Sequence, residues 1–556
     1  MVDTDAHGDP SPVGSTTDAP APRPPARASI DRWVVAVVVT VFTLAVSWFV
    51  AELVDVDPPL VAVGTRVIDA SPRWLKELAI SVFGTSDKLA LEIGTFVLLV
   101  LAARWLAGVA TRRFAVAAIG IGALGAVGLI CARWSIDGAG VIWPNLAGVA
   151  AGVVSMRWLT SPSVGRPPVA SASAGSAATA GSAGSAAEPI PRSRAEVTID
   201  RRSFVARASL LSAGAAAFGA TARVIGGTAS SGQLSLARDR ILAKLRAPSD
   251  PAPAIPASAS VGEGASPWII PNADFYRIDT ALVVPRIDLD RWRLKIGGMV
   301  DRPIELSFDD LVNRPLVERH ITMCCVSNEV GGDLVGNATW LGVPLATLLT
   351  EVGVQRGATQ LASTSEDGWT CGFPTEIALD GRDAMVAVGM NGEPLPVKHG
   401  FPVRLVVPGL YGYVSSTKWL KEITLTTLED FDGYWIPRGW SKLGPVKTQS
   451  RIDVPRAGAD VLAGTVAVAG VAWAQHRGIS KVEVRIGDGE WVEARLATEV
   501  TTDAWRQWVH PWEATAGSHV ISVRATDGTG QTQPGEQTDV APNGATGWHT
   551  VNVDVS

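Results

Sequence analysis

The stretch Ile321–Leu345, with the sequence ITMCCVSNEVGGDLVGNATWLGVPL, carries the densest set of unusual residues in the chain. Its first residues favour a strand that delivers a cysteine to a polar, glycine-rich loop, where missing side chains let a ligand approach the backbone. A single thiolate presented in this way suits a soft metal or a nucleophile. A lone cysteine is more often a small buried hydrophobe, and we expect that role for Cys324, Cys371 and Cys131.

Three sets of motifs follow one another along the second half of the chain: Cys325–Asn328 with Gly331–Gly332 and Gly336–Leu345; Asn391–Pro396 and His399–Gly409, ending at Lys418–Trp419; and Trp505–Trp508 with Val523–Asp527. In this order they resemble the cysteine loop, the pterin-binding stretch and the Ig-like tail of the sulfite oxidase family of molybdopterin-dependent oxidoreductases, and the resemblance covers residues 270–556. This resemblance implies an enzyme with a molybdenum cofactor.

The resemblance implies a five-coordinate molybdenum held by one molybdopterin dithiolene, by oxo ligands and by the thiolate of Cys325. Cys325 is preferred over Cys324 because the family's cysteine stands three residues before the motif asparagine, here Asn328. Thiolate sulfur is a soft donor, and one protein ligand leaves positions open for exchange of an oxygen atom. Cys325 is therefore expected to be both the metal ligand and the catalytic residue.

The anionic pyranopterin phosphate needs fixed donors, which arginine supplies as a bidentate fork and lysine as a point charge. Taken singly, His399 or Lys418 would more often be a surface or turn residue; together with Arg404 at the family's spacing they favour a binding site. The residues that the resemblance implies as cofactor-binding are Tyr276, Arg277, Asn328, Asp367, His399, Arg404 and Lys418.

One departure from the family bears on the substrate. In the sulfite-oxidising members a basic pair follows the C-x-x-N motif and contributes to an anion pocket, whereas Glu329 and Val330 stand there in this sequence. A sulfite pocket is therefore not expected, and the expected substrate is a small extracytoplasmic compound of the sulfur or nitrogen oxide class. Four aromatic residues either line a substrate channel or pack in the core: Tyr411, Tyr413, Tyr434 and Trp435.

Composition restricts the class of protein. At roughly 150 residues per domain, 556 residues suggest three or four domains. The chain is 47% hydrophobic and 18% charged, with a mean hydropathy of +0.21, so part of it is expected to lie in a membrane. A net charge of −6 and a pI near 5.8 give no basic field for nucleic acid, which is therefore not an expected partner.

Apolar runs near the N-terminus predict four membrane spans, because about 20 residues cross a bilayer core. These runs are Trp33–Ala51, Leu89–Leu106, Phe114–Ala132 and Gly138–Met156. Arginines cluster on one side of the predicted spans, which the positive-inside rule makes cytoplasmic: Arg23, Arg27, Arg32, Arg104, Arg112, Arg113 and Arg157. The Gly/Ser/Ala-rich residues 161–187 predict a flexible tether on that side.

The segment Asp200–Val205, DRRSFV, precedes a weakly apolar stretch from Ala208 to Ala222. This pattern resembles a twin-arginine export signal, which carries folded proteins across a membrane and suits a cofactor inserted in the cytoplasm. The alternative is a charged flank of an ordinary fifth helix. The export hypothesis places the catalytic domain outside the cytoplasm, on a multi-pass protein of the cell membrane.

We therefore predict a multi-domain chain with an N-terminal all-α transmembrane region, a mixed α+β sulfite-oxidase-type molybdopterin domain and a C-terminal all-β Ig-like sandwich. Trp292–Met299 predicts a strand and Asn391–Gly392 a hairpin turn. The expected segments are a disordered tail (1–28), four transmembrane helices (29–160), a linker (161–199), the signal and fifth helix (200–230), a spacer (231–267), the catalytic domain (268–440) and the Ig-like domain (441–556).

The histidines bear on electron transfer, because a membrane haem needs two axial ligands. None of the seven lies in a predicted span, so we expect no haem in this chain and a separate electron-transfer partner: a quinone, a cytochrome or another redox protein. The resemblance also implies a homodimer formed through the Ig-like domain. The expected activity is two-electron oxygen-atom transfer; the alternative is an extracytoplasmic ligand-binding or adhesion protein with a degenerate cofactor site.

Overall fold

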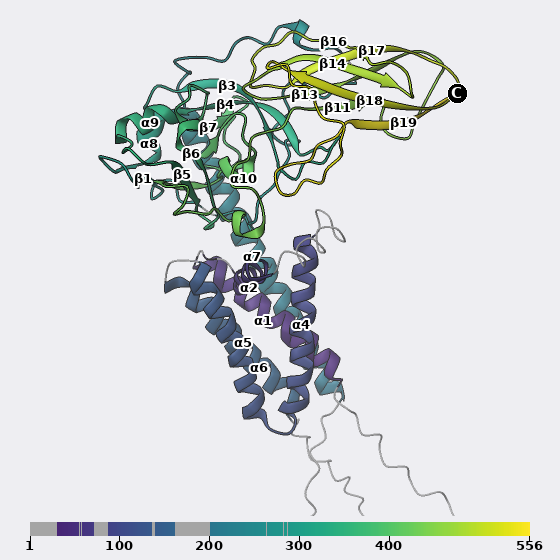
Figure 1. Ribbon diagram of the computed structural model, residues 1–556. Helices are drawn as coiled ribbons and strands as arrows, with labels where there is room; N and C mark the ends of the chain where they lie inside the picture. The colour runs from purple at the N-terminus through teal and green to yellow at the C-terminus, as the bar shows by residue number, and fades with distance from the viewer. Residues whose placement is uncertain are drawn as a thin grey trace, which may run out of the picture. The chain divides into compact units, whose positions relative to one another are not determined.

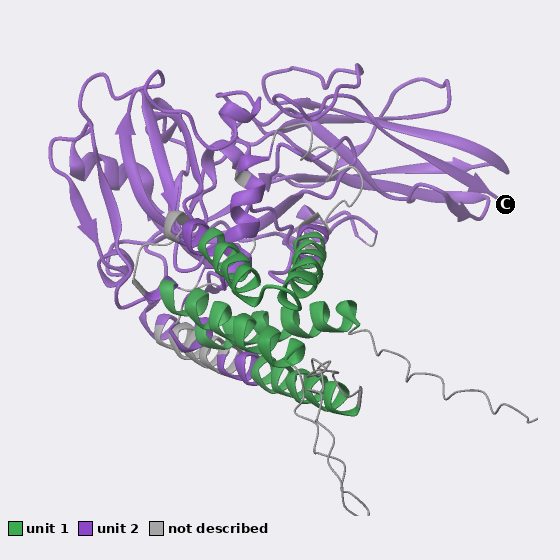
Figure 2. Cartoon of the chain, turned by 90° about the horizontal axis from the view of Figure 1, so that it is seen from below, with its two compact units in different colours: residues 1–50, 94–127, 142–220 green, residues 51–93, 128–141, 221–556 purple. Residues whose placement is uncertain are grey.

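The computed structural model describes residues 31–54, 56, 58–71, 87–135, 139–161, 201–262, 264–281, 283–285 and 287–556. The predicted tail at residues 1–28 and residues 162–199 of the predicted linker lie outside the described residues. The chain divides into two compact units (Figure 2). One contains residues 1–50, 94–127 and 142–220, and the other contains residues 51–93, 128–141 and 221–556.

The first unit is helical, and the longest described helices lie wholly or partly in it (Figure 1). They are α1 (Arg32–Leu53), α4 (Asp87–Ala110), α5 (Phe114–Ser135), α6 (Ile142–Thr160) and α7 (Arg201–Lys244), of which α7 continues into the second unit. Four segments of the described residues are long and apolar enough to cross a membrane: Arg32–Leu53, Ala90–Ala110, Phe114–Ala132 and Arg202–Ile225. The predicted helical N-terminal region with apolar helices is confirmed.

Helix α6 differs from the other long helices. It covers most of the predicted span at 138–156, but it is not among the four helices above. The physical reason is its composition, because Asn145 and Arg157 interrupt the apolar run. A short apolar helix that the sequence reasoning missed, α2 (Pro59–Ala70), is also present.

Small residues let α6 approach α1 closely. A Cβ atom on Gly148 would lie 3.3 Å from the Ser47 Cβ atom, and one on Gly152 would lie 3.0 Å from the Thr43 hydroxyl. The Ser47 hydroxyl donates a hydrogen bond to the Pro144 carbonyl at 2.9 Å. Close approach through glycines four residues apart is a common way of packing helices in membranes, where apolar burial gives no driving force.

The catalytic region is mixed α/β and contains two five-stranded sheets, each with antiparallel pairs. The first has the order β2-β1-β10-β5-β6 and the second has the order β3-β4-β7-β8, with β9 also pairing with β7. The first sheet's strands are β1 (Leu294–Gly298), β2 (Ile304–Leu306), β5 (Gln360–Ser365), β6 (Thr370–Pro374) and β10 (Leu420–Thr426). The second sheet's strands are β3 (Val317–Cys324), β4 (Val335–Pro344), β7 (Met385–Met390), β8 (Glu393–Pro394) and β9 (Arg404–Val406).

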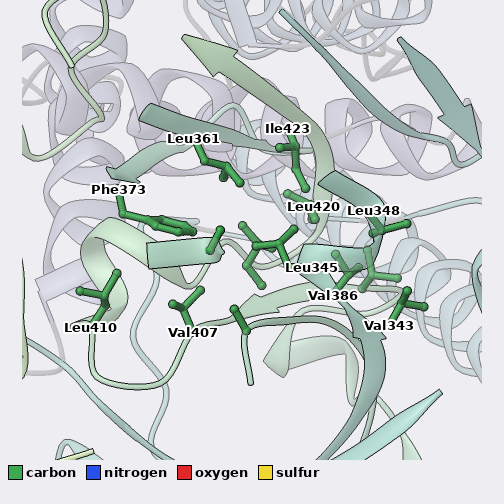
Figure 3. Close-up of a cluster of buried hydrophobic side chains, with 14 of the residues drawn as sticks. Val343, Leu345, Leu348, Leu361, Phe373, Val386, Val407, Leu410, Leu420 and Ile423 are labelled. Atoms are coloured by element: carbon green, nitrogen blue, oxygen red, sulfur yellow. The ribbon is translucent and has the colours of Figure 1, made fainter. Parts of the chain in front are cut away.

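One hydrophobic core joins these sheets to short helices. Helix α9 (Leu345–Val352) follows β4 directly and turns Leu345, Leu348 and Leu349 inward. Figure 3 shows Leu345 and Leu348 among side chains from both sheets, including Leu361 and Val386. Helices α8 (Phe308–Val312) and α10 (Gly412–Ser415) complete the region. The predicted mixed fold is confirmed, and its rigid strands position the residues described below.

The C-terminal region is β-rich, as predicted, and has two sheets. Their orders are β11-β13-β17-β16 and β12-β19-β18-β14-β15. Val468 and Trp508 from the first sheet share a core with Val482 and Ile521 from the second. The strands are β11 (Gln449–Val454), β12 (Ala459–Val461), β13 (Gly464–Trp473), β14 (Ile479–Ile486), β15 (Val492–Glu493), β16 (Arg495–Leu496), β17 (Arg506–Ala514), β18 (Gly517–Asp527) and β19 (His549–Val555). That this region is Ig-like stays a prediction.

Candidate functional site

The cysteine loop follows the last residue of β3 and returns the chain to β4. The Cys325 amide donates to the Leu334 carbonyl at 2.9 Å, and the Asn328 amide donates to the Cys325 carbonyl at 3.1 Å. The Leu334 amide donates to the Asn328 side-chain oxygen at 2.8 Å. The loop is thus closed by its own hydrogen bonds, and it holds Cys325 in a buried position, with 8% of the residue exposed.

The two neighbouring thiols differ in their surroundings. Cys324 donates to the carbonyl of Cys325 and belongs to the hydrophobic core. Burial raises the pKa of both thiols. For Cys325, hydrogen bonds from Ser327 and the charge of Lys418 oppose that rise, whereas for Cys324 only the charge of Arg451 does. Cys325 is therefore the thiol better suited to act as a thiolate.

Arg404, in β9, is a buried cation. Its guanidinium donates to the His399 carbonyl at 3.0 Å and to the Leu405 carbonyl at 3.4 Å, and it lies 5.2 Å from the ring centroid of Trp340. Burial lowers the pKa of Arg404 to about 10, and no carboxylate among the described residues pairs with it. A buried charge without a counter-charge is costly. This environment fits an anionic group such as the cofactor's phosphate.

Lys418 lies in an ion-pair network with one carboxylate. Its ammonium is 3.0 Å from Asp279 Oδ2, and Arg277 Nε is 2.8 Å from the same oxygen. Burial, with repulsion from Arg404, lowers the pKa of Lys418 to about 8, although the attraction of Asp279 opposes this. The two cations of the network, with Arg404 close enough to affect Lys418, face one described carboxylate, and this excess of positive charge again fits an anion.

His399 is buried and its protonation state is set by one hydrogen bond. Its Nε2 lies 3.0 Å from the Asn272 carbonyl, which can only accept, so Nε2 carries the proton and Nδ1 is an acceptor. Burial and the charge of Arg404 lower the pKa of His399 to about 4. The resemblance implies a phosphate donor, but this neutral tautomer suits an N–H of the pterin ring instead.

An aromatic wall borders the same residues. Phe275 stacks on Tyr276 with ring centroids 5.2 Å apart, and its edge meets Trp340 at 5.9 Å and His399 at 5.7 Å. Burial, with the charge of Cys325, raises the pKa of Tyr276 well above its usual range. The phenol of Tyr276 therefore keeps its proton near the thiol and is able to donate it in a hydrogen bond.

The last two predicted site residues differ from one another. Asn328 uses its side-chain oxygen within the loop, while its buried Nδ2 has no partner among the described residues. That open donor is a second sign of a ligand that approaches the loop. Asp367 instead accepts from the Trp369 amide of its own turn at 3.2 Å. One described hydrogen bond connects this turn to the cluster: the amide of the neighbouring Glu366 donates to the Trp419 carbonyl at 2.8 Å.

Sequence reasoning missed several members of this cluster. Asp279 and Phe275 lie in the same short segment as the predicted residues Tyr276 and Arg277, so their closeness in the sequence could have identified them. Trp340 lay inside the quoted cysteine stretch. Of the four channel candidates, Tyr411 is the one whose pKa is raised by burial together with the charges of Cys324 and Cys325. The other three belong to a packing cluster with Trp440.

Comparison with known proteins decides the family. Residues 281–435 match the family model described as "Oxidoreductase molybdopterin binding domain". The chain is 35% identical to "Uncharacterized oxidoreductase YuiH" of Bacillus subtilis over 157 residues, which are 28% of this chain and 76% of that protein. The chain belongs to the sulfite oxidase family of molybdopterin-dependent oxidoreductases. Both the predicted family and the predicted enzyme class are confirmed.

Other members of the sulfite oxidase family are similar over different lengths. The mitochondrial sulfite oxidase of Homo sapiens is 30% identical over 344 residues, covering 52% of this chain and 62% of the human protein. The NADH nitrate reductase of Solanum lycopersicum is 34% identical over 178 residues, covering 27% of this chain and 19% of the plant protein. The chain thus spans less than two thirds of the sulfite oxidases that it matches.

Proposed function

We propose that this chain is a membrane-anchored oxidoreductase that transfers an oxygen atom and two electrons at a molybdenum ligated by Cys325. One observation carries the proposal: the buried thiol of Cys325 and the buried Arg404 both act electrostatically on Tyr276, and no described carboxylate neutralises Arg404. An anionic metal cofactor would satisfy both groups. The bound cofactor would supply the redox centre that exchanges two electrons and one oxygen atom with the substrate.

Different side chains of the cluster would bind the cofactor and the substrate. Arg404 and Lys418 would neutralise the cofactor's phosphate, and Asp279, 3.0 Å from the Lys418 ammonium, fixes the direction of that side chain. Neutral His399 would accept a hydrogen bond from the pterin ring through Nδ1. The Asn328 amide and the Tyr276 phenol remain as donors beside Cys325, where they orient an oxygen atom of the substrate. Fixed donors of this kind stabilise charge that develops during the reaction.

The substrate proposed is a small sulfur or nitrogen oxide that carries little negative charge. Glu329 and Val330 occupy the places of the basic pair found in sulfite-oxidising members, and Glu329 is exposed beside the loop. Sulfite is a dianion, so a carboxylate in place of a cation lowers its local concentration and its affinity.

Sulfite turnover is therefore expected to be inefficient. We expect its kcat/KM to be about 10- to 100-fold below that of the best sulfoxide, N-oxide or oxidised methionine, since each factor of ten corresponds to about 1.4 kcal/mol. The purified full chain would be assayed with artificial electron donors and acceptors. Glu329→Gln should raise sulfite turnover several-fold. Efficient turnover of sulfite by the unaltered chain would refute this inference.

Membrane anchoring is supported by the four long apolar helices and by the arginine bias described above. We propose that α6 crosses the membrane in addition to these four helices, because five spans after a cytoplasmic N-terminus place the catalytic region outside the cytoplasm. There it would exchange electrons with a separate quinone, cytochrome or redox protein. The β-rich C-terminal region is the proposed surface for a homodimer. In this arrangement the helices anchor the enzyme next to a membrane-borne partner.

Metal analysis tests the proposal as a whole. The detergent-purified full chain is expected to contain about one molybdenum and one pterin per polypeptide, because the positive cluster around Arg404 retains an anionic cofactor through purification. Elemental analysis and pterin fluorescence measure the two quantities. A well-folded chain that lacks both, after expression with molybdate, would favour the alternative of a ligand-binding or adhesion protein with a degenerate site.

A further inference from the structure

Strand β3, which delivers Cys325, is an edge strand of its sheet. Its outer side is held by the β-rich region. The Thr322 amide donates to the Asp503 carbonyl at 2.9 Å, and Gln475 Nε2 donates to the Thr322 carbonyl at 2.7 Å. The Trp505 amide donates to the Thr322 hydroxyl at 2.7 Å. The strand is thus fixed from the C-terminal region three residues before the thiol, and its edge hydrogen-bonding groups are satisfied.

The loop that follows Cys325 is held from the same region. Gly331 has a φ of +79°, and a Cβ atom there would lie only 2.1 Å from the ring of His549, so the ring packs directly on the loop backbone. Arg451 Nη1 donates to the Gly332 carbonyl at 2.8 Å. His549 begins β19 and Arg451 lies in β11. The chain before Cys325 and the loop after it are therefore both held by residues outside the catalytic region.

His549 and Arg451 are themselves fixed in place. His549 Nδ1 accepts a hydrogen bond from the Ile452 amide at 2.9 Å. Arg451 pairs with Asp453 at 2.7 Å and donates to the Ser266 hydroxyl at 2.8 Å. Side chains that are locked in this way hold a neighbouring loop more precisely than mobile ones do.

We infer that His549 and Arg451 are positioning residues that hold the loop at 325–334 and so fix the direction of the Cys325 Sγ atom. This inference rests on the proposed role of Cys325 as the molybdenum ligand. The angle at which a thiolate meets a metal depends on the loop that carries it, and residues that support a metal ligand typically change metal affinity or activity 10- to 100-fold when replaced. The β-rich region is thereby part of the catalytic site in addition to any role in dimerisation.

Two substitutions remove the contacts with the loop, and the one at Arg451 also alters its contacts with Asp453 and Ser266. His549→Asn keeps an acceptor for the Ile452 amide but removes the ring from Gly331. Arg451→Lys keeps the positive charge but loses the fork that reaches the Gly332 carbonyl. Arg524→Lys is the matched control, because Arg524 pairs with Glu483 at 2.9 Å within the same β-rich region and has no described contact with the loop.

The first measurement uses the full chain produced without molybdate. The amides of Cys325, Asn328 and Leu334 make the hydrogen bonds that close the loop. We expect their hydrogen exchange to be about tenfold faster or more in His549→Asn and in Arg451→Lys, because loss of the support raises the population of open loop. Arg524→Lys should exchange at the unaltered rate.

The second measurement uses the molybdenum-loaded full chain. Both loop-contact variants are expected to keep the metal, to lose about 10- to 100-fold in kcat with KM changed less than twofold, and to shift the electron paramagnetic resonance signal of the pentavalent metal.

Unchanged exchange together with an unchanged signal would overturn the inference. A Cys325→Ser chain with the unaltered signal would instead overturn the proposed ligand, while the exchange result would still stand. If Arg451→Lys fails to fold, His549→Asn decides alone.

Discussion

Cys325→Ser is expected to abolish molybdenum-dependent turnover, with a loss of roughly three orders of magnitude or more, the scale on which removal of a catalytic group acts. A serine hydroxyl is a harder and far less acidic donor than a thiol, so it would bind a soft site poorly. Cys324→Ser should retain most of the activity, because that side chain points into the hydrophobic core. Turnover per bound molybdenum, with thermal unfolding as a check on folding, measures both effects.

The control for a buried thiol is Cys371→Ser. Cys371 already has hydroxyl partners, since Ser363 lies 3.3 Å and Thr417 lies 3.1 Å from its sulfur. A new hydroxyl there would have two hydroxyl partners, whereas at Cys324 the Cys325 carbonyl, 3.4 Å from the sulfur, is the one described acceptor within the apolar core, so a hydroxyl there costs up to about 1–3 kcal/mol. Cys324→Ser is therefore expected to lower the unfolding temperature more than Cys371→Ser does, without matching the activity loss of Cys325→Ser. Equal activity losses at Cys324 and Cys325 would refute the ligand assignment.

Local patterns in the sequence located much of the fold. The alternation in Trp292–Met299 predicted β1, and Asn391–Gly392 forms the turn between β7 and β8 with φ values of +54° and +75°. Those positive angles are what the Asn-Gly pair tolerates and a hairpin turn requires. The candidate residues Cys325, Arg404 and Lys418 came instead from the resemblance to the family, whose motifs are short enough to be recognised in the local sequence.

Local sequence patterns could not predict contacts between segments that are far apart in the sequence. Arg451 contacts the Gly332 carbonyl across 119 residues of sequence, and no local spacing encodes that meeting. The tautomer of His399 depends on the Asn272 carbonyl, 127 residues away. Its role in cofactor binding stays a prediction, while the hydrogen bond to Asn272 leaves Nδ1 as the acceptor. Tertiary packing, rather than local propensity, decides which nitrogen carries the proton.

Helix α7 begins at the arginine pair, and residues 202–225 of it are apolar enough to cross a membrane. Both the export-signal hypothesis and the ordinary fifth helix accommodate that helix. In the export hypothesis a receptor recognises the guanidinium groups of the arginine pair. In the ordinary fifth helix the pair acts through its positive charge alone, by the positive-inside rule. Arginine and lysine carry the same charge but differ in hydrogen-bonding geometry, so exchanging one for the other separates the two hypotheses.

Replacing Arg201 and Arg202 together by lysine is therefore expected to leave the catalytic region on the cytoplasmic side, with at least a tenfold loss of the fraction that external protease can digest in intact cells. The same change at Arg112 and Arg113, which lie between α4 and α5, preserves charge beside another helix pair and should have no effect. Normal exposure of the catalytic region in the Arg201/Arg202 variant would favour the ordinary fifth helix. Loss of export would favour the twin-arginine signal, a route for folded protein that suits a cofactor inserted before export.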